Sequence, residues 1–478
     1  MTVVLTGGSL TMDEVVRVAR GRERMEIADS AVECMREARS IVEQAVAAGE
    51  SVYGVTTGVG MRRDARVERS EIADFNRIAI SGHRVGLGEP ASVEVVRAAL
   101  VRLANGLAAG FQGARPELAR LVVDALNKRG EPNVPSLGTL GQADLAQNAD
   151  LAFGVLGNFE LAAGEAGALL VTNAFSTAQA ALAVADSHAL LNAFDAASAL
   201  DFEAFRANVG ALDEAVADSR PYPGVRQTLA ALRRLLDGSA LWEPEAARFL
   251  QDPLTFRCLP QVHGAARDAL RFVDEQLSTE LNAHQGNPLV VPAARKIVSV
   301  GNFDSLPLAM ALDFARIALA PVVTSAVERT LKLLSPRFSG LTEGLVAREG
   351  SWEDGLSELG VAAQAIAAEA RLLAQPVSFE LTSTMQESGV EDRTALTSLG
   401  ARRLEEMCSL ASRVIAIELV VAAQAVDLRG RPQLGRGTEA LFELVRSRIP
   451  FLGAGDTLPL PLEELAAAVR SGLVTGDS

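Results

Sequence analysis

Hydrophobic residues recur at helical spacing along most of the chain after residue 90. Apolar side chains at intervals of three and four residues mark the buried face of a helix. The pattern predicts helices over 92–109, 144–158, 160–198, 225–236, 263–281, 305–335, 356–375, 392–427 and 462–471. Several of these ranges exceed about 25 residues, a length typical of a large bundle whose helices also pack against other subunits.

The first 60 residues have a different pattern. Short β-branched runs, TVVLTG and SVYGVTTG, flank a helical segment near 28–48, which predicts a small α/β region at the N-terminus. A soft boundary near residue 200 separates an N-terminal domain (1–200), which holds the glycine-rich loops, from a helical bundle domain (201–478). The predicted fold class is therefore mainly α.

Composition supports a large helical core and restricts the partners. The chain has 478 residues, 49% of them hydrophobic, with two Trp, two Tyr and 17 Phe beside many Ala, Leu and Val. Such a core is built from helices that pack through small aliphatic side chains. A formal charge of -15 disfavours nucleic acid or an anionic membrane as a partner, because either would be repelled over most of the surface.

Cysteine usage and the apolar runs indicate a cytoplasmic protein. The three cysteines are odd in number and widely spaced, which fits a reducing compartment rather than a disulfide framework. The N-terminus has no basic segment followed by a long apolar run, so no signal peptide is expected. The apolar runs at 305–335 and 410–427 contain charged residues and favour bundle helices over membrane spans; their low charge density also makes oligomerisation plausible.

Four polar residues stand in apolar or turn-rich surroundings, where function tends to be placed on a helical scaffold. They are Tyr53 in YGVTTGVG, His83 in SGHRVGLGEP, Arg257 in QDPLTFRCLPQVHG and Asn302 in VGNFD. Glycines around Tyr53 let the backbone approach a ligand, and a phenol can serve as a general acid or base. The alternative for Tyr53 is an ordinary loop tyrosine that covers the core.

Arg257 and the histidines also have structural explanations. The Arg257 guanidinium suits a substrate carboxylate, but a structural ion pair with Asp252 would explain it equally well. His83 alone fits a structural histidine, and so does His188. His263 and His284 have no carboxylate or cysteine at metal-ligand spacing, so no metal site is expected.

Together these clusters resemble the aromatic amino-acid ammonia-lyase and aminomutase family, which includes histidine ammonia-lyase. The motifs occur in the family's order across at least residues 50 to 430. They are YGVTTGVG at 53–60, HRVGLGEP at 83–90, NVPSLGTLG at 133–141, RPYPG at 220–224, QDPLTFRCLPQV at 251–262, NPLV at 287–290 and GNF at 301–303.

The resemblance implies a long helical bundle of the ammonia-lyase or fumarase type, assembled as a homotetramer whose active sites take residues from three subunits. It implies that Tyr53 removes the β-proton and that Arg257 holds the substrate carboxylate. Asn173 and Gln251 would hydrogen-bond near the reacting carbon. Two further residues, Asn302 and Phe303, would line the pocket.

Three positions concern the substrate ring. His83 falls where the family selects the ring, and a histidine there accompanies a polar ring such as imidazole or phenol. QESGVED at 386–392 resembles the glutamate-bearing segment of histidine-specific members, which assigns Glu391 with Glu387 as the second choice. Leu254 is a departure, since these lyases commonly have a tyrosine at that position.

The largest departure is the loop at 138–146. In the family an Ala-Ser-Gly triplet cyclises there and loses water to form methylideneimidazolone, the electrophile that activates the amine for departure. This chain reads GTLGQADLA, one residue short and without serine. Neither Gly141-Gln142-Ala143 nor Thr139-Leu140-Gly141 supplies both the second-position serine and the third-position glycine, so no methylideneimidazolone is expected. Gln142 would instead offer a polar contact.

Without the electrophile, elimination requires a substrate with its own good leaving group, such as a quaternary ammonium. Ergothionase-type enzymes, which resemble this family but lack the electrophile, release trimethylamine from the betaine of 2-thiohistidine. The leading hypothesis is therefore a lyase of this type. Two alternatives stay open: an isomerase, hydratase or dehydratase of an acrylate-type acid that uses the same pocket, and a catalytically silent binding or scaffold protein.

Overall fold

The computed structural model describes residues 2–128, 130–379, 389–456 and 460–472. The chain forms two compact units. Unit 1 comprises residues 1–185, 273–313 and 376–402, and unit 2 comprises 186–272, 314–375 and 403–478. This division differs from the single boundary expected near residue 200, because long helices leave one unit and continue in the other.

Unit 1 combines short strands with medium-length helices, as the N-terminal pattern predicts. Strands β1 and β2 pair in parallel, from Thr2 opposite Arg24 to Leu5 opposite Ile27. The elements are β1 (Thr2–Leu5), α1 (Met12–Ala19), β2 (Arg24–Ile27), α2 (Asp29–Ala48), α3 (Ile72–Gly82), β3 (Leu87–Pro90), α4 (Val93–Ala108), α5 (Pro116–Lys128), β4 (Pro135–Leu137), α6 (Leu145–Leu156), α7 (Glu165–Leu170), β5 (Leu289–Val291) and β6 (Lys296–Val298).

Local signals define several of these helices. A capping box begins α1, in which the Thr11 side chain accepts from the Glu14 amide and the Glu14 carboxylate accepts from the Thr11 amide. The Ser92 side chain caps α4 by accepting a hydrogen bond from the Val95 amide. Gly49 ends α2 in the left-handed conformation with φ 72°. Helix α4 is buried almost throughout and packs against α1 and α5.

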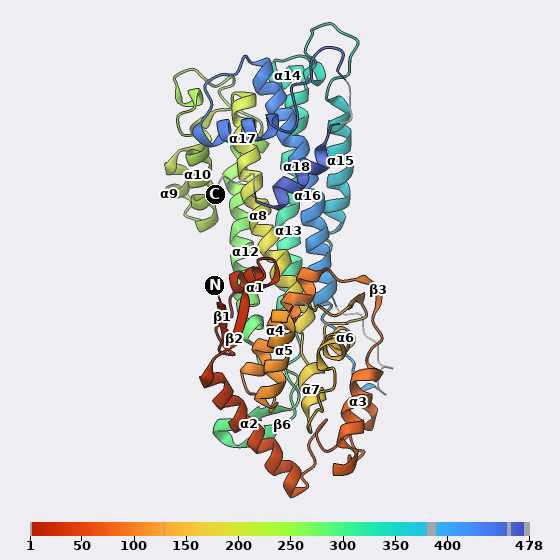
Figure 1. The fold of residues 1–478 in the computed structure, drawn as a ribbon. Helices are drawn as coiled ribbons and strands as arrows, with labels where there is room; N and C mark the ends of the chain where they lie inside the picture. Colours follow the sequence, from red (N-terminus) through yellow and green to blue (C-terminus); the bar gives the residue numbers. More distant parts are fainter. Residues whose placement is uncertain (1, 129, 380–388, 457–459, 473–478) are drawn as a thin grey trace. The chain divides into compact units, whose positions relative to one another are not determined.

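Unit 2 is a bundle of long helices (Figure 1). Four of them, α8 (Ala174–Phe205), α12 (Leu259–Asn282), α13 (Leu306–Leu334) and α16 (Thr397–Leu428), also extend into the segments of unit 1. The shorter helices are α9 (Glu214–Ser219), α10 (Pro223–Leu235), α11 (Leu254–Arg257), α14 (Pro336–Ser339), α15 (Ser357–Leu372), α17 (Arg436–Arg446) and α18 (Leu462–Arg470).

The predicted helices are confirmed with small shifts, apart from one break. The range 160–198 divides into α7 and α8, because the backbone turns at 171–173 and places Asn173 immediately before α8. The run TVVL forms β1 as expected, whereas SVYGVTTG forms turns rather than a strand. The mainly helical fold class is confirmed.

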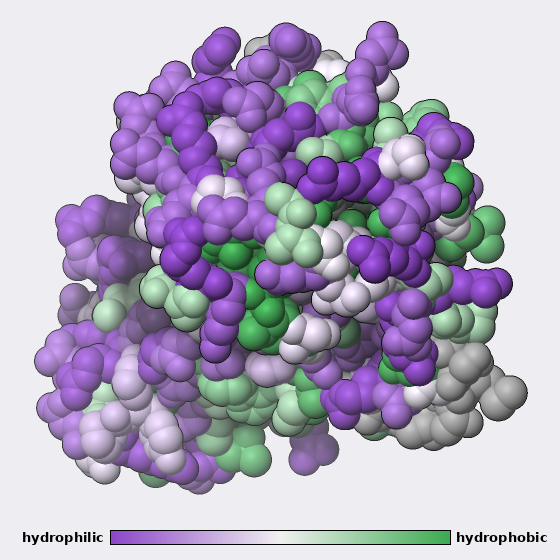
Figure 2. Space-filling view, turned by 90° about the horizontal axis from the view of Figure 1, so that it is seen from below, coloured by the Kyte–Doolittle hydropathy of each residue, from purple (hydrophilic) through white to green (hydrophobic). Residues whose placement is uncertain are grey.

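Three helical stretches are long and apolar enough to cross a membrane by length and composition alone: Glu165–Phe205, Leu306–Leu334 and Thr397–Leu428. Their apolar windows are 89%, 56% and 83% buried inside the protein, as helices of a packed bundle would be. The lower value for α13 reflects exposed Met310, Phe314 and Ile317. The face drawn in Figure 2 is mostly hydrophilic, with hydrophobic residues exposed near its middle.

Buried charges join the long helices within unit 2. Arg329 on α13 donates to Asp201 on α8 at 2.8 Å and to Glu418 on α16 at 2.7 Å. On α12, His263 contacts Asp195 of α8 through Nδ1 at 2.7 Å, and Arg267 pairs with the same carboxylate. A carboxylate only accepts, so the His263 Nδ1 holds the proton and the ring is neutral when Nε2 has none.

The buried His263 makes stability depend on pH. Burial lowers its pKa from the ordinary 6.5, with an opposing contribution from Asp195. The unfolded chain then binds the proton more tightly, so stability is complete above pH 6.5 and falls as the pH drops below it. We expect the free energy of unfolding to fall by up to about 1.4 kcal/mol per pH unit through this residue.

Chemical denaturation of the His263→Gln variant between neutral and mildly acidic pH checks this expectation. The variant should show a shallower loss of stability than the wild type. Equal slopes in the two proteins would contradict a role for His263.

Candidate functional site

The loop between β4 and α6 has unusual backbone angles, and the Asp144 side chain anchors it by hydrogen bonds. Gly138 and Gly141 have φ of 122° and 77°, and Ala143 has φ of 61°, which is strained for a residue with a Cβ atom. Asp144 does not cap its own helix α6. Its carboxylate instead accepts hydrogen bonds from the Ser176 amide at 2.7 Å and from the Thr139 hydroxyl at 2.8 Å.

Asp144 therefore ties the loop to the N-terminus of α8, where free amides and the helix dipole favour a carboxylate. The side chain is fully buried, and burial raises its pKa to about 6 against the opposing hydrogen bonds from Ser176 and Thr139. Sequence reasoning missed this anchor. Its only signal was an acidic residue just before a helix, which resembles an ordinary cap.

Two distant segments pack against the same loop within unit 1. Gln142 forms a β-bridge with Asp304, and the Ser305 hydroxyl donates to the Gly141 carbonyl at 3.2 Å. From the other side, the amides of Ala395 and Leu396 both donate to the Leu140 carbonyl, at 3.1 and 2.8 Å. The structure thus gathers the loop, the 302–305 segment and the 391–397 segment around one place.

Several predicted site residues lie in these segments. Asn302 and Phe303 precede the bridge at Asp304, and Glu391 lies two residues before Arg393, whose Nε donates to Asp304 at 3.0 Å. Glu391 is half-buried, whereas Glu387 lies outside the described residues. The Nε2 atom of Gln142 is buried and has no hydrogen-bond partner among the described residues.

Asn173 is positioned at the centre of this region. Its amide donates to Gln285 Oε1 at 3.0 Å, and its side-chain Nδ2 donates to the Phe303 carbonyl at 2.5 Å. The remaining Oδ1 is buried with no partner in the described part of the chain. An unused buried acceptor costs free energy.

Tyr53 and His83 lie in loops of unit 1. Tyr53 is half-buried, and its phenol oxygen accepts a hydrogen bond from the Gly60 amide at 3.1 Å. His83 follows the last residue of α3, and its Nδ1 lies 2.7 Å from the Ala79 carbonyl. The antiparallel pairing of β3 with β4 places the chain after His83 beside the strand that leads into the 138–144 loop.

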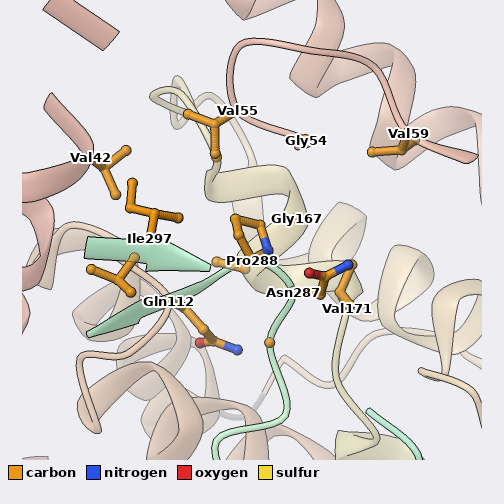
Figure 3. A pocket seen from close by; sticks show the side chains of 14 residues that line it. Val42, Gly54, Val55, Val59, Gln112, Gly167, Val171, Asn287, Pro288 and Ile297 are labelled. Carbon is orange, nitrogen blue, oxygen red and sulfur yellow. The ribbon is translucent and has the colours of Figure 1, made fainter. Parts of the chain in front are cut away.

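A small cavity lies behind the Tyr53 loop (Figure 3). It measures about 30 Å³, room for about one water molecule. Its lining is mainly apolar and glycine-rich and includes Gly54, Val55, Gly167, Val171, Asn287 and Pro288. The cavity is too small for an amino-acid substrate and belongs to the packing beneath the loops.

The remaining predicted residues belong to unit 2. Gln251, Leu254 and Arg257 are all exposed, and Arg257 ends the short helix α11. Arg257 does not form the ion pair with Asp252 that was its alternative explanation. Its Nε donates to the Asp252 backbone carbonyl at 3.0 Å, while the Asp252 carboxylate accepts from the Asn208 amide at 2.6 Å.

One contact of His263 lies outside what sequence spacing can indicate. Asp195, 68 residues away in sequence, supplies a carboxylate partner. The spacing rule could not find this pair because the contact joins two helices. The pair is fully buried, so it serves packing rather than substrate. Among the described residues no group of three potential metal ligands occurs.

Comparison with known proteins agrees with the mainly helical fold. The chain matches the aromatic amino acid lyase family over residues 10–162 and 156–447. It is 31% identical to a histidine ammonia-lyase of Alkaliphilus oremlandii, covering 98% of this chain and 97% of the relative. It is 34% identical to one from Symbiobacterium thermophilum, covering 99% and 97%.

Solved structures give the same result. Ergothionase of Treponema denticola, an ergothioneine-degrading enzyme, superposes with a TM-score of 0.94 at 26% identity over 100% of both chains. Tyrosine aminomutase of Streptomyces globisporus superposes with a TM-score of 0.91 at 27% identity, covering 99% of this chain and 98% of that one. The chain therefore belongs to the aromatic amino acid lyase family.

Proposed function

We propose that this lyase works without methylideneimidazolone and eliminates a pre-activated leaving group, most concretely trimethylamine, from the betaine of an imidazole amino acid. The observation that carries the proposal is the 138–144 loop. It has no serine and is one residue shorter than the family's motif. The similarity to ergothionase supports the same assignment.

The residues present do not fit the electrophile. Ring closure requires a backbone amide free to attack the carbonyl two residues earlier, and the exocyclic methylene requires a serine-type side chain between them. Here the Gly141 amide, which belongs to the third residue of Thr139-Leu140-Gly141, donates to the Thr139 hydroxyl at 3.0 Å. The second residues of the two triplets, Leu140 and Gln142, supply no hydroxyl.

The substrate must then supply the activation. A trimethylammonium group leaves as a neutral amine and needs no proton removed first, unlike a primary ammonium that must first become an adduct. Each pKa unit of improvement in the leaving group is worth about 1.36 kcal/mol, so a few units replace much of the missing activation.

In the proposed reaction Tyr53 acts as the base. Its phenolate oxygen takes the proton from the β-carbon, the C–H electrons form the double bond, and the C–N electrons depart with trimethylamine. The products are a conjugated acrylate and the free amine. The Gly60 amide, 3.1 Å from the phenol oxygen, stabilises the negative charge that this oxygen carries before it takes the proton.

Other residues bind the substrate in this proposal. Arg257 holds the carboxylate with two parallel hydrogen bonds, since its Nε contact leaves both terminal nitrogens available. His83 and Glu391 bind the polar ring. With Nδ1 donating to the Ala79 carbonyl, a neutral His83 keeps Nε2 as an acceptor for a ring N–H. Asn173 Oδ1 and Gln142 Nε2 offer the remaining polar contacts.

We also propose a cytoplasmic homotetramer whose sites combine residues of different subunits. The exposed apolar residues of α13, Met310, Phe314 and Ile317, are consistent with burial against another copy. Neither a metal nor a nucleic acid is required by this chemistry. Gln251, Leu254 and Arg257 would then contribute to a site that residues of other subunits complete.

Intact-mass spectrometry tests the loop assignment. The purified protein should have the mass of its encoded chain and no near-ultraviolet absorbance from a dehydrated loop. Neither Gly141-Gln142-Ala143 nor Thr139-Leu140-Gly141 contains serine. Introducing serine alone by Gln142→Ser should leave the mass without dehydration, since the third residue, Ala143, is still not glycine. A deficit of two water masses in the wild type would contradict the proposal.

A further inference from the structure

Three arginines of unit 2, Arg206, Arg248 and Arg429, lie together without a carboxylate partner. None of them forms an ion pair or a side-chain hydrogen bond with an acidic residue among the described residues. This is unusual in a chain with 60 acidic and 45 basic residues and a charge of -15. Grouped positive charges repel one another, and the cost rises where water is partly excluded.

Backbone contacts hold the three side chains in one place. Arg206 and Arg248 belong to segments that pair with each other: the Arg248 amide donates to the Arg206 carbonyl at 3.0 Å, and Arg206 Nε donates to the Ala246 carbonyl at 2.9 Å. Arg429 Nη2 donates to the Ser339 carbonyl at 2.7 Å, and its Nε donates to the Ala204 carbonyl.

The turn after α14 brings Arg248 next to Arg429. Gly340 has φ of 64°, and a Cβ atom there would lie 2.5 Å from both terminal nitrogens of Arg248. The guanidinium of Arg248 therefore rests on Gly340, one residue from the carbonyl that Arg429 contacts. A side chain at position 340 would occupy the space that the guanidinium fills.

Arg248 is the member whose side chain forms no hydrogen bond in the described part of the chain. Its guanidinium contacts the ring of Phe249, with 5.2 Å from Cζ to the ring centroid, and Nη1 is buried with no partner in the described ranges. Burial, followed by the charges of Arg248 and Arg206, lowers the pKa of Arg429 to about 10. All three arginines are nevertheless charged at neutral pH.

The geometry points to a binding site for a phosphoryl oxyanion formed by Arg206, Arg248 and Arg429 around the Ser339–Gly340 turn. Arg206 and Arg429 already use their Nε atoms on carbonyls, which fixes the planes of both guanidiniums and leaves terminal N–H groups to donate. These two oriented guanidiniums and that of Arg248 match the charge and the several acceptors of a phosphate dianion better than those of a singly charged carboxylate.

A bound oxyanion would also stabilise the segment that precedes Gln251 and Arg257. Hydrogen bonds join this segment to residues 206–208: one comes from the Arg248 amide, and another from Asn208, whose Nδ2 donates to the Leu250 carbonyl at 3.0 Å. The anion would add bonds between the same two segments. We therefore expect slower amide exchange in residues 246–252 when the site is filled.

Isothermal titration of the full-length protein with inorganic phosphate tests this site. Chloride is adjusted to keep the ionic strength constant, and glycerol 3-phosphate is titrated in parallel. We expect saturable binding of inorganic phosphate at one site per chain. Binding of glycerol 3-phosphate as well would show that a phosphomonoester supplies the oxyanion, whereas binding of inorganic phosphate alone would show that the free ion does.

Variants assign the binding to the cluster. Arg248→Gln should weaken phosphate binding at least about tenfold, because it removes the guanidinium with no other partner. The phosphate affinity of Arg248→Lys should lie between those of Arg248→Gln and the wild type. Lysine keeps the charge but cannot donate two parallel hydrogen bonds. Arg234→Gln, which removes an exposed charge of α10 outside the cluster, should bind as the wild type does.

Stability without phosphate gives an independent readout. In phosphate-free buffer Arg248→Gln should unfold at no lower temperature than the wild type, because it relieves repulsion and breaks no hydrogen bond. No saturable binding of either probe, equal affinity of Arg248→Gln and the wild type, or a lower unfolding temperature of Arg248→Gln without phosphate would each overturn the proposal.

Discussion

Replacing Tyr53 with phenylalanine is expected to lower the turnover number for betaine elimination by roughly 100- to 10,000-fold, the usual contribution of a positioned general base. Phenylalanine keeps the ring and its packing but has no oxygen to accept the β-proton. The variant loses the hydrogen bond from the Gly60 amide, at 3.1 Å. The fold should therefore survive with a small loss of stability, about 1 kcal/mol.

The chain offers a matched control for this change. It has only two tyrosines, and the other, Tyr222, is 52% exposed in unit 2. Tyr222→Phe should keep wild-type turnover. Steady-state kinetics on the betaine, with circular dichroism to confirm folding, distinguish the two variants. If a folded Tyr53→Phe protein retained more than about a tenth of wild-type turnover, Tyr53 would not be the base.

Replacing Arg257 with leucine is expected to lower kcat/KM by roughly 100- to 1,000-fold, because two charge-assisted hydrogen bonds to the substrate carboxylate are lost. Most of this loss should appear as a higher KM, since the carboxylate is bound in the ground state as well as in the transition state. Arg257→Lys should recover part of the affinity, because it keeps the charge.

The exposed arginine Arg226, which pairs with Asp218, provides the control for charge alone. Arg226→Gln should leave kcat and KM unchanged. A substrate analogue that replaces the carboxylate with a neutral amide should bind the wild type and Arg257→Leu equally weakly. A KM for Arg257→Leu equal to that of the wild type would exclude Arg257 from carboxylate binding.

The long helices could be predicted from the sequence because their apolar spacing repeats over many turns. Helices such as α8, α13 and α16 are confirmed within a few residues, except where the chain turns at 171–173. Shorter helices, including α3 and α17, were missed because few turns give a weak pattern. The division into units could not be predicted, because it depends on tertiary contacts along helices that run through both.

For the site, sequence motifs located the loops but not the contacts that shape them. The resemblance selected Asn173 and Phe303, and the structure joins them by a hydrogen bond between the Asn173 side chain and the Phe303 carbonyl. The burial of Asp144 and its bond to the start of α8 could not be read from the motif, since both depend on a helix 30 residues further along. The Asp195–His263 pair was missed for the same reason.

The absence of the serine, by contrast, can be read directly from the sequence. The structure adds why the loop has so little freedom: Leu140 accepts two amides, Gln142 is bridged to Asp304, and Ala143 holds a left-handed conformation. A loop fixed in this way is suited to shape a pocket. In the proposed reaction the chemistry comes from the substrate and from Tyr53.

The most direct test of this proposal compares substrates that differ only in the leaving group and the ring. The wild-type protein is incubated separately with histidine, its trimethyl betaine and the 2-thio derivative of that betaine. Formation of a conjugated acrylate is followed by near-ultraviolet absorbance, with trimethylamine and ammonia measured in the same samples. We expect acrylate and trimethylamine from one or both betaines and no ammonia from histidine. Release of ammonia from histidine, or no acrylate from either betaine, would contradict the proposed leaving-group chemistry.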